Sequence, residues 1–383
     1  MDGNKLSSPR PFTPPTTEED RLLWLRLIRS RRVGPATFFR LFTEHGSAAA
    51  AFEALPGIAR ASGLSDYTPC THKAAERELS LGRSKGAHLL CLGDPDYPAA
   101  LAALSDPPPV LWVMGQLRLL EQPAVALVGA RNASSLGLRT ARKLAEGLGF
   151  HGFTTVSGLA RGIDAAAHGA SLKSGTVAVM AGGVDMIYPQ ENAPLAAAIA
   201  DQGLRISEQP IGLQAQARHF PRRNRLISGL ARAVIVIEAA EGSGSLITAR
   251  DALDQGREVL AVPGHPLDAR AAGCNQLIRG GAVLVRDVAD VIEALENSVA
   301  PRTQPSADLS DTPQHAPQRP PAKPLDTLSL HRMILDSLGP APVAEDQLLR
   351  DLGQPGATVA AALLFLELDG RVLRQPGGLL SRA

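Results

Sequence analysis

The middle of the chain alternates short apolar runs with stretches long enough to form helices. Helix-length segments lie at 135–149, 162–172, 192–202, 222–231, 245–256 and 273–280. Seven runs have the length and composition of buried strands: Val125–Val128, Thr154–Val156, Val177–Met180, Arg205–Ser207, Val234–Ile237, Val259–Val262 and Val283–Val285. This alternation predicts an α/β domain whose parallel sheet is covered by helices on both faces. Ligands of such sheets bind beyond the carboxyl ends of the strands, so candidate chemistry is sought in the residues after each run.

The segments on either side of this core have different patterns. Apolar residues recur at helical spacing after Glu18, and Val33-Gly34-Pro35 predicts a tight turn between two helices. The prolines of 91–123 predict an extended connector. Three short helices and a hairpin are predicted near the C-terminus, which is the plan of a winged helix. The predicted domains are a disordered lead (1–17), a helical domain (18–90), the α/β core (91–298), a proline-rich flexible linker (299–325) and a winged-helix-like domain (326–383).

Composition narrows the classes of function. Of the 383 residues, 39 are Lys or Arg and 38 are Asp or Glu, so the formal net charge is only +1. A site for a polyanion must therefore be a local patch of positive charge. The three cysteines are widely spaced, which argues against a disulfide framework or a zinc site and favours a reducing cytoplasm. No apolar run approaches the roughly 20 residues of a membrane span, and the N-terminus lacks a signal-peptide pattern. We therefore expect a cytoplasmic protein with no membrane partner.

Two of the predicted strand-end loops carry a glycine turn, an arginine and a helix start. Gly129 and Arg131 follow the first strand, where the N–H groups of the helix start favour an anion. Gly158 and Arg161 follow the second strand, and Asp164 lies four residues before His168, which suggests a local polar pairing. A plain strand–helix turn with a surface arginine is the alternative interpretation of the first loop.

Two further loops add an arginine cluster and hydroxyl donors. Phe220-Pro221-Arg222-Arg223-Asn224-Arg225 places three arginines beside an aromatic ring at a predicted helix start. Arginine holds phosphate oxygens bidentately, and a ring can stack on a base. Ser243-Gly244-Ser245 opens the next helix with backbone and hydroxyl donors, although Ser245 could equally be an N-cap. A solvated basic turn with Phe220 in the core is the alternative for the arginine cluster.

The loops together predict a trough for a polyanion along one edge of the sheet. No paired carboxylates, Ser/His/Asp set or metal cluster falls at these positions, and His265 is expected to be structural. A chain of phosphates fits such an edge better than one mononucleotide does. We therefore expect a binding protein without catalysis, metal or cofactor.

The same loops resemble those of the DNA-processing protein A (DprA/Smf) family. The matching stretches run in unbroken order over about 94–285: Asp94–Pro98, Val128–Arg131, Ser157–Asp164, Tyr188-Pro189, Phe220–Arg225, Ser243–Ala249 and Val262–Gly264. The resemblance implies an extended Rossmann-like core, with an N-terminal helical domain of sterile-alpha-motif or helix-hairpin-helix type and a C-terminal winged-helix-like domain. It also implies a homodimer that binds single-stranded DNA and hands it to the RecA recombinase in natural transformation and competence.

By motif match, the resemblance assigns roles to individual residues. Arg131 would hold phosphates, Arg161 would add positive charge, and Phe220 would stack on a base. Ala217 stands where some relatives have a lysine, and the adjacent Arg218 is the candidate substitute. Removing the charge of Arg131 or of Arg223 is expected to weaken binding while the fold survives. The predicted DNA-binding residues are Gly129, Arg131, Ser134, Gly158, Arg161, Arg218, Phe220, Arg222, Arg223, Asn224, Arg225, Ser243, Gly244 and Ser245.

The C-terminal domain departs from a DNA reader. Its expected recognition helix, 356–369, contains no Lys or Arg and ends with Glu367 and Asp369. A helix without basic residues is poorly suited to phosphate contact, so a protein-docking or accessory role is favoured.

Two enzyme hypotheses remain as alternatives. The first is a nucleoside-monophosphate phosphoribohydrolase on a related Rossmann-like fold, for which Glu238 or Glu241 would have to be the catalytic carboxylate. The second is a dinucleotide-dependent oxidoreductase, which the absence of a G-x-G-x-x-G loop disfavours.

Overall fold

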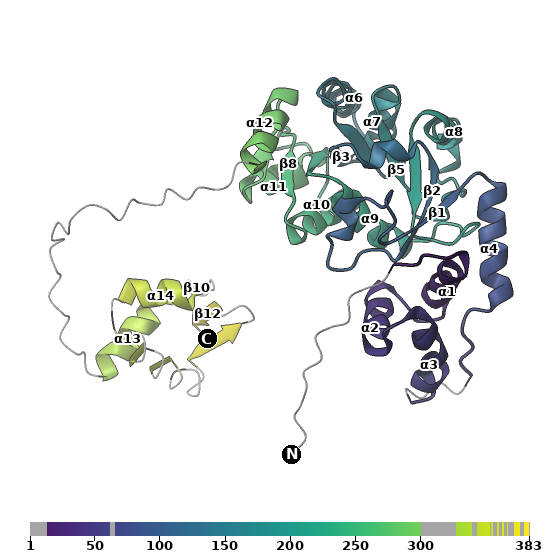
Figure 1. The fold of residues 1–383 in the computed structure, drawn as a ribbon. Helices are drawn as coiled ribbons and strands as arrows, with labels where there is room; N and C mark the ends of the chain where they lie inside the picture. Colours follow the sequence, from purple (N-terminus) through teal and green to yellow (C-terminus); the bar gives the residue numbers. More distant parts are fainter. Residues whose placement is uncertain are drawn as a thin grey trace, which may run out of the picture. The chain divides into compact units, whose positions relative to one another are not determined.

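The computed structural model describes most of the chain. The described residues are 14–61, 66–299 and, nearer the C-terminus, 327–338, 343–352, 354, 358–359, 362–363, 366, 371–375 and 379–382. The chain forms two compact units, 1–303 and 304–383 (Figure 1). The predicted linker at 299–325 lies almost entirely outside the described residues, as does most of the predicted lead at 1–17.

Four helices form the N-terminal part of the first unit. A capping box fixes the first of them, because the Thr17 side chain accepts from the backbone N–H of Asp20 and the Asp20 carboxylate accepts from that of Thr17. Trp24 and Phe38 pack edge to face in the core between the first two helices, with their ring centroids 5.2 Å apart. The helices are α1 (Glu18–Arg29), α2 (Pro35–His45), α3 (Ala48–Ala61) and α4 (His72–Ser84).

A nine-stranded sheet forms the rest of this unit. Its strand order is β1-β2-β6-β5-β4-β3-β7-β8-β9. The strands from β3 onward are parallel, as predicted, because each is followed by a helix that returns the chain to the same end of the sheet. These strands are β3 (Ala124–Gly129), β4 (Thr154–Ser157), β5 (Thr176–Val179), β6 (Leu204–Ser207), β7 (Ala233–Ile237), β8 (Glu258–Ala261) and β9 (Val283–Leu284).

The sequence did not predict the first two strands. β1 (His88–Cys91) lies almost entirely at the end of the predicted helical domain, and part of the expected connector forms β2 (Val110–Gly115). β2 pairs antiparallel with both β1 and β6. Val110 to Val113 are all buried, so this apolar run extends the sheet after the prolines end. The sheet is therefore mixed at this edge rather than wholly parallel.

Helices cover both faces of the sheet. On one face, α6, α7 and α12 pack over Val125, Leu127 and Ile235, and α8 covers the neighbouring part (Figure 1). On the other face, α5, α9, α10 and α11 pack over Ala126, Val234 and their neighbours. The bounds are α5 (Ala99–Ala102), α6 (Ser135–Phe150), α7 (Ile163–Ser171), α8 (Ala193–Gln202), α9 (His219–Leu230), α10 (Gly244–Asp254), α11 (Ala272–Arg279) and α12 (Val288–Val299), with short 3-10 turns η1 (Leu117–Leu120) and η2 (Gln190–Asn192).

The second unit contains helices and a small antiparallel sheet. Its described elements are α13 (Thr327–Ser337), β10 (Val343–Ala344), α14 (Glu345–Leu352), β11 (Val372–Gln375) and β12 (Leu379–Arg382), and the sheet order is β10-β12-β11. Leu330, Ile334 and Leu348 are among its buried residues. Most of the predicted recognition helix at 356–369 lies outside the described residues. The predicted fold class, with its helical, α/β and winged-helix parts, is confirmed.

No helix within the described part of the chain has the length and apolar character needed to cross a membrane.

Candidate nucleic-acid interface

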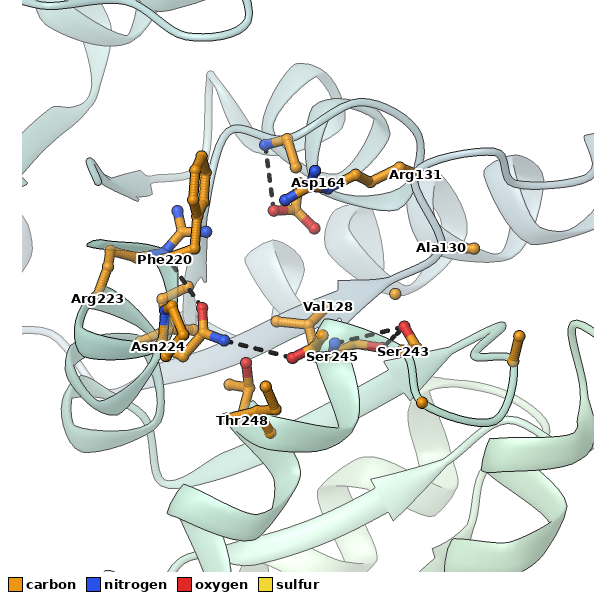
Figure 2. A pocket seen from close by; sticks show the side chains of 18 of the residues that line it. Val128, Ala130, Arg131, Asp164, Phe220, Arg223, Asn224, Ser243, Ser245 and Thr248 are labelled. Atoms are coloured by element: carbon orange, nitrogen blue, oxygen red, sulfur yellow. Dashed lines mark hydrogen bonds between the residues drawn. The ribbon is translucent and has the colours of Figure 1, made fainter. Parts of the chain in front are cut away.

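A hollow of about 850 Å³ lies at the carboxyl ends of β3 and β7. Its walls come from the loop after β3, the start of α9 and the loop between β7 and α10 (Figure 2). The two strands are neighbours at which the strand order reverses, since β4 to β6 extend to one side and β7 to β9 to the other. Open α/β sheets bind ligands at such a topological switch point. We call this hollow the switch-point pocket.

An exposed arginine and two aromatic rings meet in this pocket. The guanidinium carbon of Arg131 lies 5.2 Å from the centroid of the Phe220 ring, within cation–π reach. Tyr188 packs edge-on against the same ring, with the centroids 5.7 Å apart, and is itself 54% exposed. Phe220 is half-buried and lines the pocket, so it is not a core residue. A cation beside exposed rings suits a ligand in which a phosphate is joined to a base.

Arg223 lies at the back of the same pocket and is only 6% exposed. Its Nη1 donates to the carbonyl oxygens of Gly158 and Val179, at 2.6 and 2.7 Å. Burial lowers the pKa of Arg223 to about 10, which still leaves the guanidinium charged at neutral pH. Arg223 therefore supports the loop after β4, and its loss would remove two buried hydrogen bonds. Charge removal is therefore still expected to leave the fold intact at Arg131, whereas at Arg223 it is expected to destabilise the fold.

Asp164 holds the same loop from the other side. Its buried carboxylate accepts from the backbone N–H groups of Gly158 and Ala160, at 3.1 and 3.2 Å. Burial raises the pKa of Asp164, while the charge of Arg223 opposes that rise. The predicted pairing of Asp164 with His168 is wrong, because Nδ1 of His168 lies 2.7 Å from the Thr176 hydroxyl instead. A buried cation and a buried carboxylate together fix the loop that borders the pocket.

The start of α10 forms the opposite wall. The Ser243 hydroxyl accepts from the backbone N–H of Ser245 and lies 2.8 Å from the Ser245 hydroxyl. Asn224 donates to the carbonyl of Gly244 at 3.3 Å and so ties α9 to this turn (Figure 2). Asn224 and the two serines therefore contribute to the shape of the wall as well as offering polar atoms to a ligand.

The predicted anion site at the start of α6 needs correction. The backbone N–H of Ser134 donates to the Glu238 carboxylate at 2.7 Å, and the Ser134 hydroxyl also contacts that carboxylate. Glu238 follows β7 and has a φ of 53°, a left-handed conformation uncommon for residues other than glycine. The Glu238 carboxylate thus lies at the N-terminal end of α6, where the sequence pattern predicted that an anionic ligand would bind.

Two predicted glycines have structural reasons for being glycine. A Cβ at Gly129 would lie 1.8 Å from the carbonyl oxygen of Ile237, so the close approach of β3 and β7 requires glycine there. A Cβ at Gly158 would lie 2.2 Å from the Arg223 guanidinium, and Gly158 is buried. Gly129 lines the pocket, whereas Gly158 does not.

The remaining predicted arginines are distributed around the pocket. Arg225 points away from it, donating to the carbonyl oxygen of Asp106 at 2.8 Å and pairing with Glu208 at 2.5 Å. Arg218 and Arg222 are exposed at the start of α9 but do not line the pocket. Arg161 lies at the carboxyl end of β4 and lines an adjoining hollow together with Arg131. The helix that carries this cluster begins at His219, two residues before the predicted proline.

The pocket lining also contains an aromatic residue and a cation that the sequence pattern did not assign to the site, Tyr188 and Arg270. Tyr188 was part of a matched motif but received no role. Arg270 follows β8 and pairs with Asp268 at 3.1 Å. His265, in the same loop, is exposed. Tyr188 and Arg270 both follow strands of the parallel sheet, so a search of the strand-end loops for every cation and aromatic residue would have found them.

The two carboxylates considered for catalysis in the phosphoribohydrolase alternative have different surroundings. Glu238 is held by Ser134, and Glu241 is exposed on the pocket wall.

Burial raises the pKa of Cys91 to about 12 and that of Cys274 to about 11, which disfavours their thiolates. Among the described residues, no three His, Cys, Asp or Glu side chains gather in a group that could hold a metal ion.

Three family models match successive parts of the chain. "DprA-like N-terminal HHH domain" matches residues 18–80, "DNA recombination-mediator protein A" matches 88–296, and "DprA winged helix domain" matches 316–378. The middle match contains every wall of the switch-point pocket. These matches confirm the family resemblance that the motifs indicated.

Individual relatives agree with the family models. Protein Smf of Synechocystis is 34% identical over 397 residues, which cover 94% of this chain and 98% of the relative. The crystal structure of DNA processing protein A from Streptococcus pneumoniae is similar with a TM-score of 0.60 and 35% identity, covering 73% of this chain and 98% of the other. A Helicobacter pylori DNA processing protein A, whose structure concerns its single-stranded DNA binding mode, has a TM-score of 0.51 and 30% identity, covering 55% and 96%.

Proposed function

Because this chain belongs to the family of DNA recombination-mediator protein A, known as DprA or Smf, we propose that it binds single-stranded DNA in the switch-point pocket. The single observation that carries the proposal is the placement of Arg131 over the Phe220 ring, at 5.2 Å, in a pocket at the switch point of the sheet. Support also comes from the Helicobacter pylori relative, which is described as binding single-stranded DNA.

In this proposal the pocket binds one strand through its phosphates and its bases. Arg131 contacts a phosphate, and the positive end of the α10 helix dipole lies at the wall of the same pocket. Phe220 and Tyr188 present rings to the unstacked bases. Arg223 and Asp164 hold the loop between these groups rather than being the main contacts. Arg218 and Arg222 add positive charge around the pocket. Three other predicted residues are not proposed as DNA contacts, because other groups of the protein already engage or bury them: Ser134, Gly158 and Arg225.

These contacts imply binding without sequence preference. Phosphate contacts carry no sequence information, and every base has a face on which a ring can stack. They also imply a preference for single strands, because bases inside a duplex are not available for stacking on a protein ring. The proposed task is binding, with no reaction; release of adenine from adenosine monophosphate by the purified protein would revive the phosphoribohydrolase alternative.

We further propose that the protein is a homodimer that delivers its bound strand to the RecA recombinase. Family membership supports this part. Light scattering after size exclusion measures the dimer. Faster assembly of RecA filaments on single-stranded DNA, lost with Arg131→Gln, is the result expected for delivery.

The binding proposal is tested by comparing single-stranded and duplex DNA at two salt concentrations. Fluorescence anisotropy with a labelled oligothymidylate should give tight binding that weakens with salt, with a log–log slope of about −0.7 for each phosphate contacted. An unlabelled duplex should compete poorly. Equal competition by the duplex, or binding that does not respond to salt, would contradict the proposed contacts.

A further inference from the structure

A second hollow of about 680 Å³ lies beside the switch-point pocket. It runs along the paired helices α6 and α7 and is bordered by the loop after β3. Arg131 and Asn132 line both hollows, so the two meet at these residues. We call the second hollow the α6–α7 groove.

Three arginines line this groove, and they come from three different segments. Arg131 comes from the loop after β3, Arg142 from α6 and Arg161 from the turn before α7. All three are exposed. Two carboxylates, Glu146 and Glu191, line the groove as well, so one positive charge remains in excess.

The two carboxylates do not prevent the groove from binding an anion. Arg161 pairs with Glu191 at 2.6 Å, but their side chains are 60% and 50% exposed. An ion pair this exposed has little net stability, so a phosphate can compete for the guanidinium. Glu146 follows Arg142 by one helical turn, and its charge should weaken an anion bound there.

The composition of the groove indicates which part of a nucleic acid would fit. Ala165, Ala166 and Gly169 of α7 line the groove, so only small side chains stand between a ligand and this helix. Every residue of the lining lies within the described range 66–299, and none is aromatic. The groove therefore offers charge without a stacking surface, which suits a sugar–phosphate backbone and not a base.

We propose that the α6–α7 groove carries the backbone of the strand onward from the switch-point pocket, with Arg142 and Arg161 as additional phosphate contacts. The inference rests on the proposed function, because the groove opens from the pocket at Arg131 and Asn132. A short oligonucleotide fills the pocket alone, whereas a longer one reaches the groove. Arg142 should therefore matter for the longer strand only.

The matched control lies on the same helix. Arg139 and Arg142 are both exposed residues of α6, and only Arg142 lines the groove. Arg142→Gln and Arg139→Gln make the same change in net charge at positions three residues apart. Anisotropy is measured for both variants and the parent, each with an oligothymidylate of about 5 and one of about 15 nucleotides, sizes within the range of single-strand binding sites.

The expected result is specific to Arg142 and to the longer strand. Arg142→Gln should weaken binding of the longer strand roughly 3- to 10-fold and make its salt slope shallower by about 0.7, with the shorter strand unaffected. Glu146→Gln should strengthen binding of the longer strand. Equal effects of Arg142→Gln and Arg139→Gln on the longer strand would overturn the groove while leaving the pocket in place. Failure of the parent protein to bind either strand would instead overturn the proposed function.

Discussion

The carboxylate of Glu238 accepts hydrogen bonds from both the backbone N–H and the hydroxyl of Ser134, a residue 104 positions earlier in the chain. The Ser134 hydroxyl also accepts from the backbone N–H of Gly137, at 3.0 Å, and so caps α6. A Cβ at Gly137 would lie 2.5 Å from the Glu238 carboxyl carbon. This contact joins the ends of β3 and β7 next to the pocket and neutralises the start of one helix. The starts of α9 and α10 still line the pocket.

Ser134→Ala should destabilise the protein without changing DNA affinity directly. The substitution removes an N-cap and one hydrogen bond to a carboxylate, which together cost about 1–3 kcal/mol. Urea denaturation measures the loss. Ser135→Ala is the control, because Ser135 is the exposed first residue of α6 and its loss should cost less than about 0.5 kcal/mol. Equal stability of the two variants would mean that neither the N-cap nor the contact of the hydroxyl with Glu238 contributes to stability.

Arg131→Gln and Arg223→Gln should fail in different ways. Arg131 is exposed, so its loss should leave the unfolding free energy nearly unchanged, weaken binding of single strands and make the salt slope shallower by about 0.7. Arg223 donates two buried hydrogen bonds, so its loss should cost roughly 2 kcal/mol or more of stability. Thermal unfolding and anisotropy on both variants separate the two roles. A fully stable Arg223→Gln protein would show that the loop does not depend on this guanidinium.

Phe220→Ala should weaken single-strand binding by about 1–3 kcal/mol, the usual contribution of a ring stacked on a base. Phe220→Tyr keeps the ring and should bind nearly as tightly as the parent. Tyr188→Ala tests the second ring, which is more exposed than Phe220. Since stacking involves no charge, these changes should leave the salt slope as it is. A shallower slope in Phe220→Ala would indicate that the ring acts by holding Arg131 and not by stacking.

His168 should make the protein sensitive to acid. Burial, with a smaller effect from the charge of Arg223, lowers the pKa of His168 from 6.5 to about 3. The folded state thus binds a proton less readily than the unfolded state does, so the stability that depends on neutral His168 is complete above pH 6.5 and is lost as the pH falls towards 3. Between pH 7 and 5 the loss should be about 2 kcal/mol. Urea denaturation across this range should show a weaker pH dependence for His168→Gln than for the parent; parallel curves would contradict the assignment.

The order of strands and helices in the core followed from the sequence because each buried parallel strand is a short apolar run. Val234–Ile237 and Val259–Val262 match β7 and β8 to within a residue or two at each end. The strand β2 was not predicted because the prolines before Val110 suggested a connector. Sequence alone also does not show that an apolar run pairs antiparallel with a strand almost a hundred residues later. Long-range pairing has no local signal.

Within the site, the residue types were predictable but their partners were not. The strand-end rule placed Arg131, Phe220 and Ser243 at one edge, and the structure brings them to one pocket. The sequence could not show that Glu238 would cap α6, that Arg225 would pair with Glu208, or that Arg223 would be buried. Each of these depends on a contact between segments that are distant in the chain or on how deeply a helix packs.

Photo-crosslinking tests the central claim most directly, because it shows where a bound strand lies. A single-stranded oligonucleotide containing 5-iodouracil is irradiated with the full chain, and the crosslinked peptides are identified by mass spectrometry. We predict crosslinks at Phe220 or Tyr188, the rings beside Arg131, and their loss when excess unlabelled single strand is added. Crosslinks confined to the amino ends of the strands or to the C-terminal unit, with none in the pocket, would contradict the account.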